Sequence, residues 1–271
     1  MNDMDSENII SVKNLVKEFP GKIKAVDDIS FSVKKGEMFA FLGPNGAGKT
    51  TTIKMLTTLL NPTSGEIEIN GFDPINQKSE SRKSFGIVFQ DPSLDNELTA
   101  LENLQFHSAL YSVPKKLAEE RIAYLLNLVD LEEKKNDFVK TFSGGMKRRL
   151  EIARGLIHHP AILFLDEPTL GLDPQTRNLI WQHLKELNKK EKMTVFFTTH
   201  YMQEVENTAS RIAIIDRGKI LSQGTLKEIK SQTKSKSLEQ AFIKLTGKNI
   251  RKESSDMSKV RMRQTARMMG G

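Results

Sequence analysis

The chain has 271 residues, of which 38% are apolar and 28% charged, so it can bury a core and is not typical of a disordered or fibrous protein. It contains no cysteine, which excludes a disulfide scaffold, a thiolate metal site and a cysteine nucleophile. No apolar run approaches the roughly 20 residues that cross a bilayer, and the polar, acidic residues 1–8 do not resemble a secretory signal, so we expect a cytosolic protein.

The formal net charge of +7 is concentrated near the C-terminal end. Residues 1–226 hold 29 Lys and Arg against 30 Asp and Glu, whereas residues 227–271 hold 12 against 4. Such a basic tail can contact anionic lipid or RNA, although a solvated terminal segment needs no partner at all. We favour the solvated segment. We expect a short basic extension over residues 225–271, with its last part disordered, and no nucleic-acid partner.

Two kinds of strand are predicted along the chain. Residues 13–19, 29–33 and 66–70 alternate polar and apolar side chains, which is typical of an antiparallel sheet with one solvated face. A second group of segments is apolar almost throughout: residues 38–42, 161–165 and 193–197. Such runs indicate parallel strands that are buried on both faces.

A glycine-rich loop follows the first of these buried strands. Residues Gly43 to Thr50 fit the pattern G-x-x-x-x-G-K-[ST], in which backbone N–H groups surround a polyphosphate. Gly46 and Gly48 can take the positive φ angles that such a loop requires. A helix is predicted to begin at Lys49, so that its positive end faces the phosphates. Lys49 would then reach the β and γ phosphates, and Thr50 would offer its hydroxyl to Mg²⁺.

The middle of the chain is predicted to form a separate helical lobe. After a strand at 85–89 the sequence turns helical between Gln90 and Phe142, and the apolar residues 122, 125, 126 and 129 fall on one helix face. Nearer the C-terminal end, the sequence predicts a strand pair that turns at Arg217-Gly218, and then a helix-prone stretch from Gly224 to about Lys244.

Two adjacent acids end the buried strand at 161–165. Carboxylates at the tip of a buried strand are costly unless a cation or hydrogen bonds receive them. A bound Mg²⁺ would receive Asp166 in this way. Because side chains alternate along a strand, Glu167 is free to hold an attacking water as general base. The alternative is that the two acids simply begin a loop after the strand. The presence of a phosphate-binding loop in the same chain disfavours this alternative.

These motifs together resemble those of the nucleotide-binding subunits of ATP-binding-cassette (ABC) transporters. The resemblance extends from Lys13 to about Gly224, and its most specific element is Phe-Ser-Gly-Gly-Met-Lys-Arg-Arg-Leu at 142–150, which is similar to the family's signature sequence. It implies the α/β fold of a P-loop NTPase, with a mixed, largely parallel core sheet, an N-terminal antiparallel β subdomain and a helical subdomain. The implied ATP-binding domain covers residues 9–224, with the helical subdomain at about 91–158.

In that family two subunits pack head to tail, and each ATP lies between the phosphate loop of one and the signature of the other. The resemblance therefore implies ATP and Mg²⁺ as cofactors and a second ATP-binding subunit, which we expect to be an identical copy. The implied ATP-binding residues are Phe19, Val26, Gly43, Pro44, Asn45, Gly46, Ala47, Gly48, Lys49, Thr50 and Thr51. The implied signature residues, which contact the ATP of the other subunit, are Ser143, Gly144, Gly145 and Met146.

The resemblance also implies roles in hydrolysis and assembly. The implied catalytic residues are Lys49, Gln90, Glu167 and His200, and the implied metal-binding residues are Thr50, Gln90 and Asp166. Asp173 ends a stretch similar to the loop that crosses the dimer interface, and Phe19 takes the place of an aromatic that stacks on adenine. The remaining histidines match no motif, and we expect them at the surface or at helix ends: His107, His158, His159 and His183.

One position departs from the family's pattern. Met146 stands where glutamine is usual and has no amide, which puts a ribose contact in doubt. Methionine followed by Lys-Arg-Arg resembles the exporter branch that includes drug-resistance ATPases. The resemblance thus implies an ATPase on the cytoplasmic side of the membrane, working with a separately encoded permease. One alternative is a soluble ATPase of this type that acts on ribosomes or DNA. Another is a nucleotide-binding regulator without turnover, which the presence of Glu167 and His200 disfavours.

Overall fold

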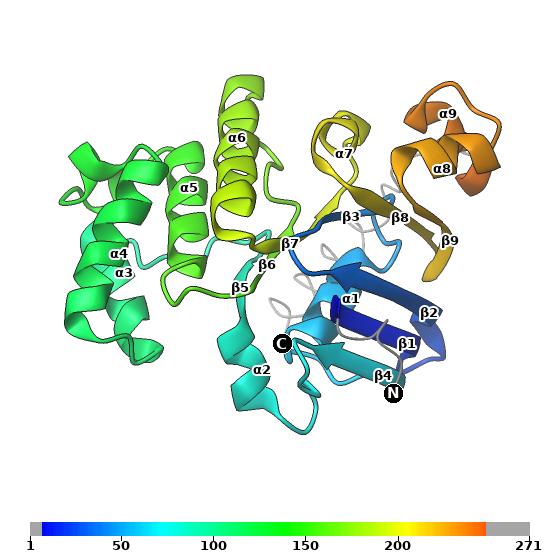
Figure 1. The fold of residues 1–271 in the computed structure, drawn as a ribbon, viewed down its shortest axis with the longest axis horizontal. Coiled ribbons are helices and arrows are strands. Elements are labelled where there is room, and N and C mark those ends of the chain that lie inside the picture. Colours follow the sequence, from blue (N-terminus) through cyan, green and yellow to red (C-terminus); the bar gives the residue numbers. More distant parts are fainter. Residues whose placement is uncertain (1–6, 248–271) are drawn as a thin grey trace, which may run out of the picture.

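The computed structural model describes residues 7–247, and the expected disorder at the end of the basic tail lies outside these residues. A six-stranded sheet runs through the molecule in the order β5-β6-β7-β3-β8-β9 (Figure 1). Its first five strands are parallel, and β9 is antiparallel to β8. The strands are β3 (Met38–Leu42), β5 (Phe85–Val88), β6 (Ile162–Asp166), β7 (Thr194–Thr199), β8 (Arg211–Asp216) and β9 (Lys219–Gly224).

The near-continuous apolar runs form the buried centre of this sheet, as predicted. All residues of β3, β6 and β7 are buried. Successive side chains of a strand point to opposite faces, so Phe39 and Phe41 enter one hydrophobic core while Ala40 and Leu42 enter the other. The sheet therefore separates two cores.

A smaller antiparallel sheet covers one of these cores. Its order is β2-β1-β4, with β1 (Asn8–Phe19), β2 (Ile23–Lys34) and β4 (Ser64–Ile69). Helix α1 (Lys49–Leu56) contacts β2 of this sheet and β6 of the larger one. Phe196 of β7 lies within the same core, where its ring is 5.6–6.0 Å from the rings of Phe31, Phe39, Phe41 and Phe164, measured between centroids.

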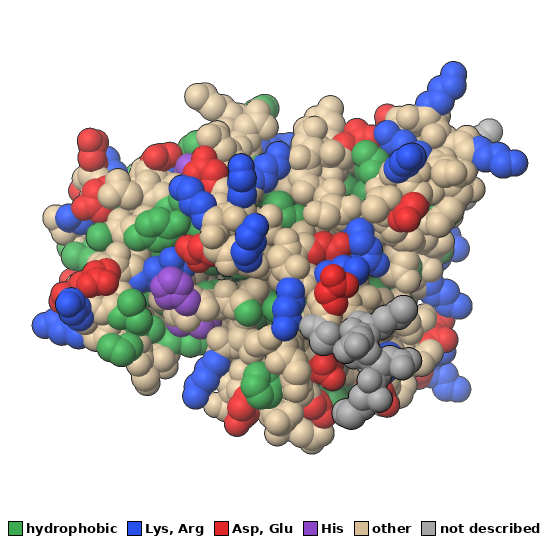
Figure 2. All heavy atoms as spheres, in the orientation of Figure 1, with side chains coloured by type: hydrophobic (Ala, Val, Ile, Leu, Met, Phe, Trp, Pro, Cys, Tyr) green, Lys and Arg blue, Asp and Glu red, His purple; other side chains and the backbone are tan. Residues whose placement is uncertain are grey.

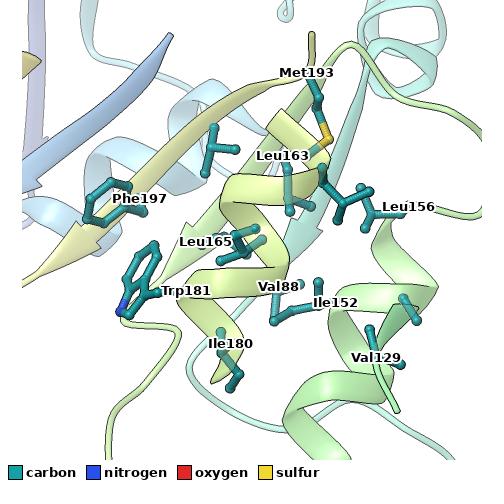
Figure 3. Close-up of a cluster of buried hydrophobic side chains, with 14 of the residues drawn as sticks. Val88, Val129, Ile152, Leu156, Leu163, Leu165, Ile180, Trp181, Met193 and Phe197 are labelled. Atoms are coloured by element: carbon teal, nitrogen blue, oxygen red, sulfur yellow. The ribbon is translucent and has the colours of Figure 1, made fainter. Parts of the chain in front are cut away.

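The predicted helical lobe lies between β5 and β6 in sequence and beside the sheet in space (Figure 1). Short helix α2 (Lys78–Ser84) precedes β5, and the lobe contains α3 (Ala100–Leu110), α4 (Lys115–Leu128), the 3-10 turns η1 (Glu132–Lys134) and η2 (Val139–Thr141), and α5 (Gly144–Gly155). The apolar residues 122, 125, 126 and 129 are buried, as their spacing predicts. They join the second core, part of which Figure 3 shows between α5, β6 and α6 (Pro174–Glu191).

The helix-prone C-terminal stretch forms two helices that pack on the rest of the fold. They are α8 (Leu226–Gln232) and α9 (Leu238–Thr246), and α9 contacts α7 (Met202–Thr208) and β9. Leu238 and Ala241 of α9 are fully buried in the second core. The domain limit at residue 224 stays a prediction, although the packed structure continues beyond it. No helix within residues 7–247 is long and apolar enough to span a bilayer.

One expectation about the histidines is wrong. His183 lies inside α6 and is buried, with its Nε2 atom 3.4 Å from an Asp130 carboxylate oxygen. His158 is half-buried, because its ring stacks on that of Tyr111 with centroids 3.7 Å apart. Burial lowers the pKa values of His107 and His158 from 6.5 to about 4. The side chains of His107 and His158 therefore remain neutral at neutral pH.

The ring cluster between the two sheets predicts the effect of a core substitution. We expect Phe196→Ala to lower the free energy of unfolding by about 3–5 kcal/mol, because the cavity would be lined by four other rings on three strands. Phe106→Ala, whose side chain is 61% exposed on α3, should change the free energy of unfolding by less than about 0.5 kcal/mol. Urea unfolding of both variants tests this. Equal losses would contradict it.

Candidate nucleotide-binding site

The predicted site residues meet at one edge of the large sheet. Strands β6, β7 and β3 are parallel neighbours, so their carboxyl ends lie at the same edge. The phosphate loop (residues 43–51) follows β3, Asp166 and Glu167 close β6, and His200 follows β7. Ligands of open α/β sheets bind in crevices outside such strand ends.

The glycines of the phosphate loop are required for two different reasons. Gly46 and Gly48 have φ angles of 75° and 108°, which confirms the prediction that they take positive values. Gly43 is needed for close packing instead, because a Cβ atom there would lie 2.4 Å from the carbonyl oxygen of Ile215. A Cβ on Gly48 would also lie 2.5 Å from the carbonyl oxygen of Ala25. The loop is thus held tightly against β2 and β8.

The other residues of the phosphate loop differ in how exposed they are. Asn45 and Gly46 are exposed at the tip, and Ala47 is buried and donates its N–H to Pro44. Helix α1 begins at Lys49, as predicted, and Thr50 and Thr51 are half-buried in its first turn. Val26 of β2 is buried beside the loop, since a Cβ on Gly48 would lie 3.5 Å from its Cγ2 atom.

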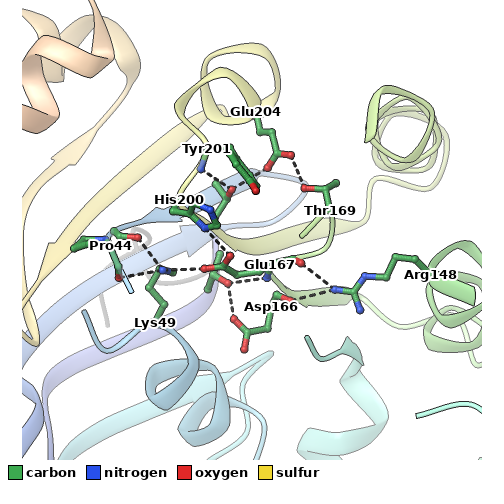
Figure 4. A network of polar contacts seen from close by, with 12 residues as sticks. Pro44, Lys49, Arg148, Asp166, Glu167, Thr169, His200, Tyr201 and Glu204 are labelled. Carbon is green, nitrogen blue, oxygen red and sulfur yellow. Dashed lines mark hydrogen bonds and ion pairs between the residues drawn. The ribbon is translucent and has the colours of Figure 1, made fainter. Parts of the chain in front are cut away.

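Lys49 is a buried cation at the centre of the site (Figure 4). Its Nζ atom donates to the carbonyl oxygens of Gly43 at 2.8 Å and Pro44 at 3.2 Å. It also lies 3.0 Å from Oε1 of Glu167, whose side chain is 8% exposed. A buried ammonium group needs such anionic and carbonyl partners, and phosphate oxygens satisfy the same requirement.

Glu167 is held by its backbone and by both carboxylate oxygens. Its φ angle is +48°, which is uncommon for a residue with a side chain. Its N–H group donates to Oγ1 of Thr198 at 3.0 Å. Its Oε2 atom lies 2.7 Å from Nδ1 of His200. The carboxylate therefore sits between Lys49 and His200, as Figure 4 shows, and can accept a proton from a group held beside it.

Asp166 offers one oxygen ligand of the kind that a divalent cation prefers. The residue is 1% exposed, and its Oδ1 atom accepts a 2.6 Å hydrogen bond from Oγ1 of Thr198. Its buried Oδ2 atom finds no hydrogen-bond partner among residues 7–247. A buried carboxylate oxygen without a donor fits a hard cation such as Mg²⁺. Asp166 thus fits the metal role expected from the sequence, and that role stays a prediction.

Gln90 and Phe19 occupy more exposed positions. Gln90 follows β5 by two residues and is exposed, whereas the predicted strand extended one residue further, to Phe89. Because β5 and β6 are parallel and Val88 pairs with Leu165, Gln90 and Glu167 both follow their strands at the same edge of the sheet. Phe19 is 38% exposed at the end of β1, with the Lys17 ammonium 5.3 Å from its ring centroid. An adenine that stacks on Phe19 would have to replace the Lys17 ammonium on that face of the ring, or stack on the opposite face.

The signature segment begins helix α5 in the helical lobe. Ser143 is its N-cap and accepts a hydrogen bond from the N–H of Met146 at 3.3 Å. Ser143 and Gly144 are exposed, so their polar groups can meet an anion from outside the chain. The Met146 side chain packs against the second core instead. The side chain is partly buried and offers no hydrogen-bonding amide at this position.

The predicted interface loop is tied to the signature within the chain. Asp173 is the N-cap of α6 and accepts hydrogen bonds from Thr176, at 2.6 Å from its hydroxyl and 3.0 Å from its N–H. These bonds lower the pKa of Asp173. A Cβ on Gly145 would lie 2.7 Å from Cγ2 of the same Thr176. Helices α5 and α6 therefore begin in close contact because residue 145 is glycine.

Three residues of the network were not foreseen from the sequence. Thr198 contacts both acids, and Arg148 of α5 donates to the backbone that follows β6. Glu204 of α7 is buried and accepts hydrogen bonds from the hydroxyls of Thr169 and Thr199, next to Glu167 and His200 (Figure 4). The two adjacent threonines before His200 are the sequence feature that could have indicated Thr198. No such feature indicated Arg148, because the carbonyls that it contacts are remote in sequence. None indicated Glu204 either, because its contact with Thr169 joins segments that are remote in sequence.

The arrangement agrees with comparisons to known proteins. A family model described as "ABC transporter" matches residues 26–170. The linearmycin resistance ATP-binding protein LnrL of Bacillus subtilis is 44% identical over 83% of this chain and 71% of its own length. The Nod factor export ATP-binding protein I of Ralstonia nicotianae is 41% identical over 83% of this chain and 69% of its own length.

Solved structures of nucleotide-binding subunits are similar in fold. A structure of an ATP-binding subunit of an ABC transporter superposes with a TM-score of 0.81 at 31% identity, covering 88% of this chain and all of that chain. An ATP-binding cassette in a dimeric post-hydrolysis state, bound to ADP and Pi, superposes with a TM-score of 0.72 at 29% identity. It covers 80% of this chain and 98% of its own.

The loop geometry predicts unequal effects of two alanine substitutions. Both Gly46 and Gly48 have positive φ, but nothing lies within 4 Å of a Cβ at Gly46, whereas Gly48 faces the Ala25 carbonyl. We expect Gly48→Ala to lower the free energy of unfolding by about 1–3 kcal/mol more than Gly46→Ala does. Urea unfolding without nucleotide measures the difference. If the two variants were equally stable, the tight packing of the loop on β2 would be refuted.

Proposed function

The chain belongs to the ABC transporter family, and from this membership we propose that it powers the export of a small molecule by closing around ATP with a second copy of itself. Its activity is that of the family's ATP-binding subunits, the binding and hydrolysis of ATP. The observation that carries the assignment of residues is the buried contact of Lys49, Glu167 and His200 beside the phosphate loop. The export role is supported by the resistance and export names of the two curated relatives.

In the proposed mechanism, Lys49 exchanges partners when ATP binds. Its ammonium group leaves the Glu167 carboxylate for the β and γ phosphate oxygens, while the loop N–H groups surround the β phosphate. Asp166, Thr50 and Gln90 would hold Mg²⁺, which neutralises charge on the phosphates when bound. Glu167, released from Lys49 but still beside His200, orients a water and accepts its proton. His200 is then placed to contact the γ-phosphate.

We further propose that the second half of each ATP site comes from the other subunit. The hydrogen bonds of Ser143 lie within its own helix, and the signature lies in the helical lobe rather than at the sheet edge of Lys49. An exposed helix N-terminus with a serine and two glycines suits a γ-phosphate offered from outside. When the two subunits close, the contact of Gly145 with Thr176 would transmit the movement of the signature to the interface loop at Asp173.

The proposed membrane partner is a separately encoded permease that contacts the helical lobe. Large apolar side chains are exposed there, with Phe106 61% and Leu110 63% accessible one turn apart on α3. Figure 2 shows apolar side chains on the surface of this lobe. Such a position would place the protein on the cytoplasmic side of the membrane. The alternative of a soluble ATPase that acts on ribosomes or DNA finds no support in the two curated relatives named above.

The general-base role of Glu167 predicts a separation of binding from hydrolysis. We expect Glu167→Gln to bind ATP at least as tightly as the wild type, because a neutral amide competes with the phosphates for Lys49 less than the carboxylate does. Its kcat should fall by about 10²-fold or more, since an amide accepts no proton from water. Phosphate release and binding of a fluorescent ATP analogue measure the two effects. Glu120→Gln, exposed on α4, is the control, and normal turnover of Glu167→Gln would remove the base role.

If each ATP site is shared by two subunits, a change in the signature should prevent dimer formation without preventing ATP binding. In the Glu167→Gln background, ATP should convert the chain to a dimer, and adding Ser143→Arg should keep it monomeric while ATP still binds. The arginine would occupy the place of the γ-phosphate of the other subunit. Light scattering after size exclusion measures the mass. Ser231→Arg, exposed on α8, should still dimerise. An unimpaired dimer with Ser143→Arg would rule out the signature as half of the site.

A further inference from the structure

A buried arginine links the signature helix to the backbone of the catalytic strand. Arg148 lies in the second turn of α5 and is 7% exposed. We propose that Arg148 is a positioning residue that fixes the orientation of Glu167 and transmits the position of the signature helix to it. This inference rests on the proposed role of Glu167 as general base.

The guanidinium group of Arg148 donates to four backbone carbonyls at the ends of two strands. Nε donates to Pro168 at 2.7 Å, and Nη2 donates to Asp166 at 3.1 Å and Glu167 at 3.2 Å. Nη1 donates to the carbonyl of Phe89, directly before Gln90. One planar group thus spans the ends of β6 and β5, as Figure 4 shows for its β6 side.

These contacts act where the chain leaves the sheet. Buried carbonyls beyond a strand end lose their ladder partners, so another donor must satisfy them. Glu167 also has a φ angle of +48°, which persists only if its surroundings hold it. Thr198 fixes the N–H of Glu167, and Arg148 fixes its carbonyl together with the N–H of Leu170, so both peptide groups that flank the side chain are anchored.

The charge of Arg148 is balanced inside the protein. Nη1 lies 3.1 Å from Oε2 of Glu151, which is 2% exposed. Burial lowers the pKa of Arg148, and Glu151 acts in the opposite direction. The other carboxylate oxygen of Glu151 accepts from the N–H of Ser93 at 2.8 Å. The pair therefore ties α5 to the segment that follows Gln90 as well as to the strand end.

A purely structural role is the competing explanation, and Arg121 provides a matched comparison. Arg121 is 5% exposed, donates to the carbonyl of Leu156, and pairs with Glu191 at 2.7 Å. It joins α4 to α5 and α6, away from the sheet edge that carries Glu167. Loss of either guanidinium leaves a carboxylate without its charge partner, Glu191 for Arg121 and Glu151 for Arg148. Of the two arginines, Arg148 alone contacts a peptide group of the proposed base.

The test compares Arg148→Met with Arg121→Met in the full-length chain. Both should lower the melting temperature, and both should bind a fluorescent ATP analogue within about threefold of the wild type. The kcat of Arg148→Met should fall at least tenfold with KM nearly unchanged, whereas that of Arg121→Met should fall less than threefold. Arg148→Lys should recover part of the loss, since its ammonium reaches one or two of the carbonyls. If Arg148→Met does not fold, Arg148→Lys against Arg121→Lys gives the same comparison.

A double-mutant cycle with Glu167→Gln tests whether Arg148 acts through Glu167. In single-turnover hydrolysis, Arg148→Met should slow the Glu167→Gln chain less than threefold, because the group it positions has already been disabled. Equal kcat values for Arg148→Met and Arg121→Met would overturn the proposal, as would a change in KM alone or a full tenfold loss in the Glu167→Gln background. Normal hydrolysis by Glu167→Gln itself would instead refute the base role on which the proposal rests.

Discussion

The carboxylates of Asp166 and Glu167 are buried at the end of β6, and the rest of the site is organised by the need to compensate them. A buried carboxylate is tolerated only with cations or hydrogen-bond donors around it. Lys49 from the phosphate loop, Thr198 from β7 and His200 beyond it supply these groups. Three loops that follow different strands are therefore held together at one edge of the sheet.

The same charge compensation allows the site to rearrange when a phosphate binds. Lys49 is shared between carbonyl oxygens and one carboxylate, so an incoming phosphate competes for it with Glu167. The backbone of Glu167 is anchored by Thr198 and Arg148, and Arg148 belongs to the helix that Ser143 begins. In the proposed dimer, a contact made at the signature by the other subunit would reach the proposed base of this one through helix α5 and the hydrogen bonds of Arg148. ATP binding, dimer formation and hydrolysis would then be linked through few groups.

Local sequence patterns predicted the parts of the fold that local rules determine. The strands β3, β6 and β7, the start of α1 at Lys49 and the positive φ angles of Gly46 and Gly48 follow from hydrophobic periodicity and loop chemistry. The interactions that complete the site do not follow from them. Arg148 reaches Phe89, and Gly43 packs on Ile215, across sequence separations that no periodicity encodes. The burial of His183 was missed because it depends on how α6 packs.

If two chains share each nucleotide, mixing two inactive variants of the chain should restore ATP hydrolysis. Lys49→Ala disables the phosphate loop and Ser143→Arg disables the signature, so a mixed dimer of the two would contain one site that is intact on both sides. ATP hydrolysis by an equimolar mixture should rise well above the sum of the separate variants, towards about a quarter of the wild-type rate per chain if the sites act independently. Hydrolysis that stays at the sum, in a sample where affinity capture shows mixed dimers, would contradict the account.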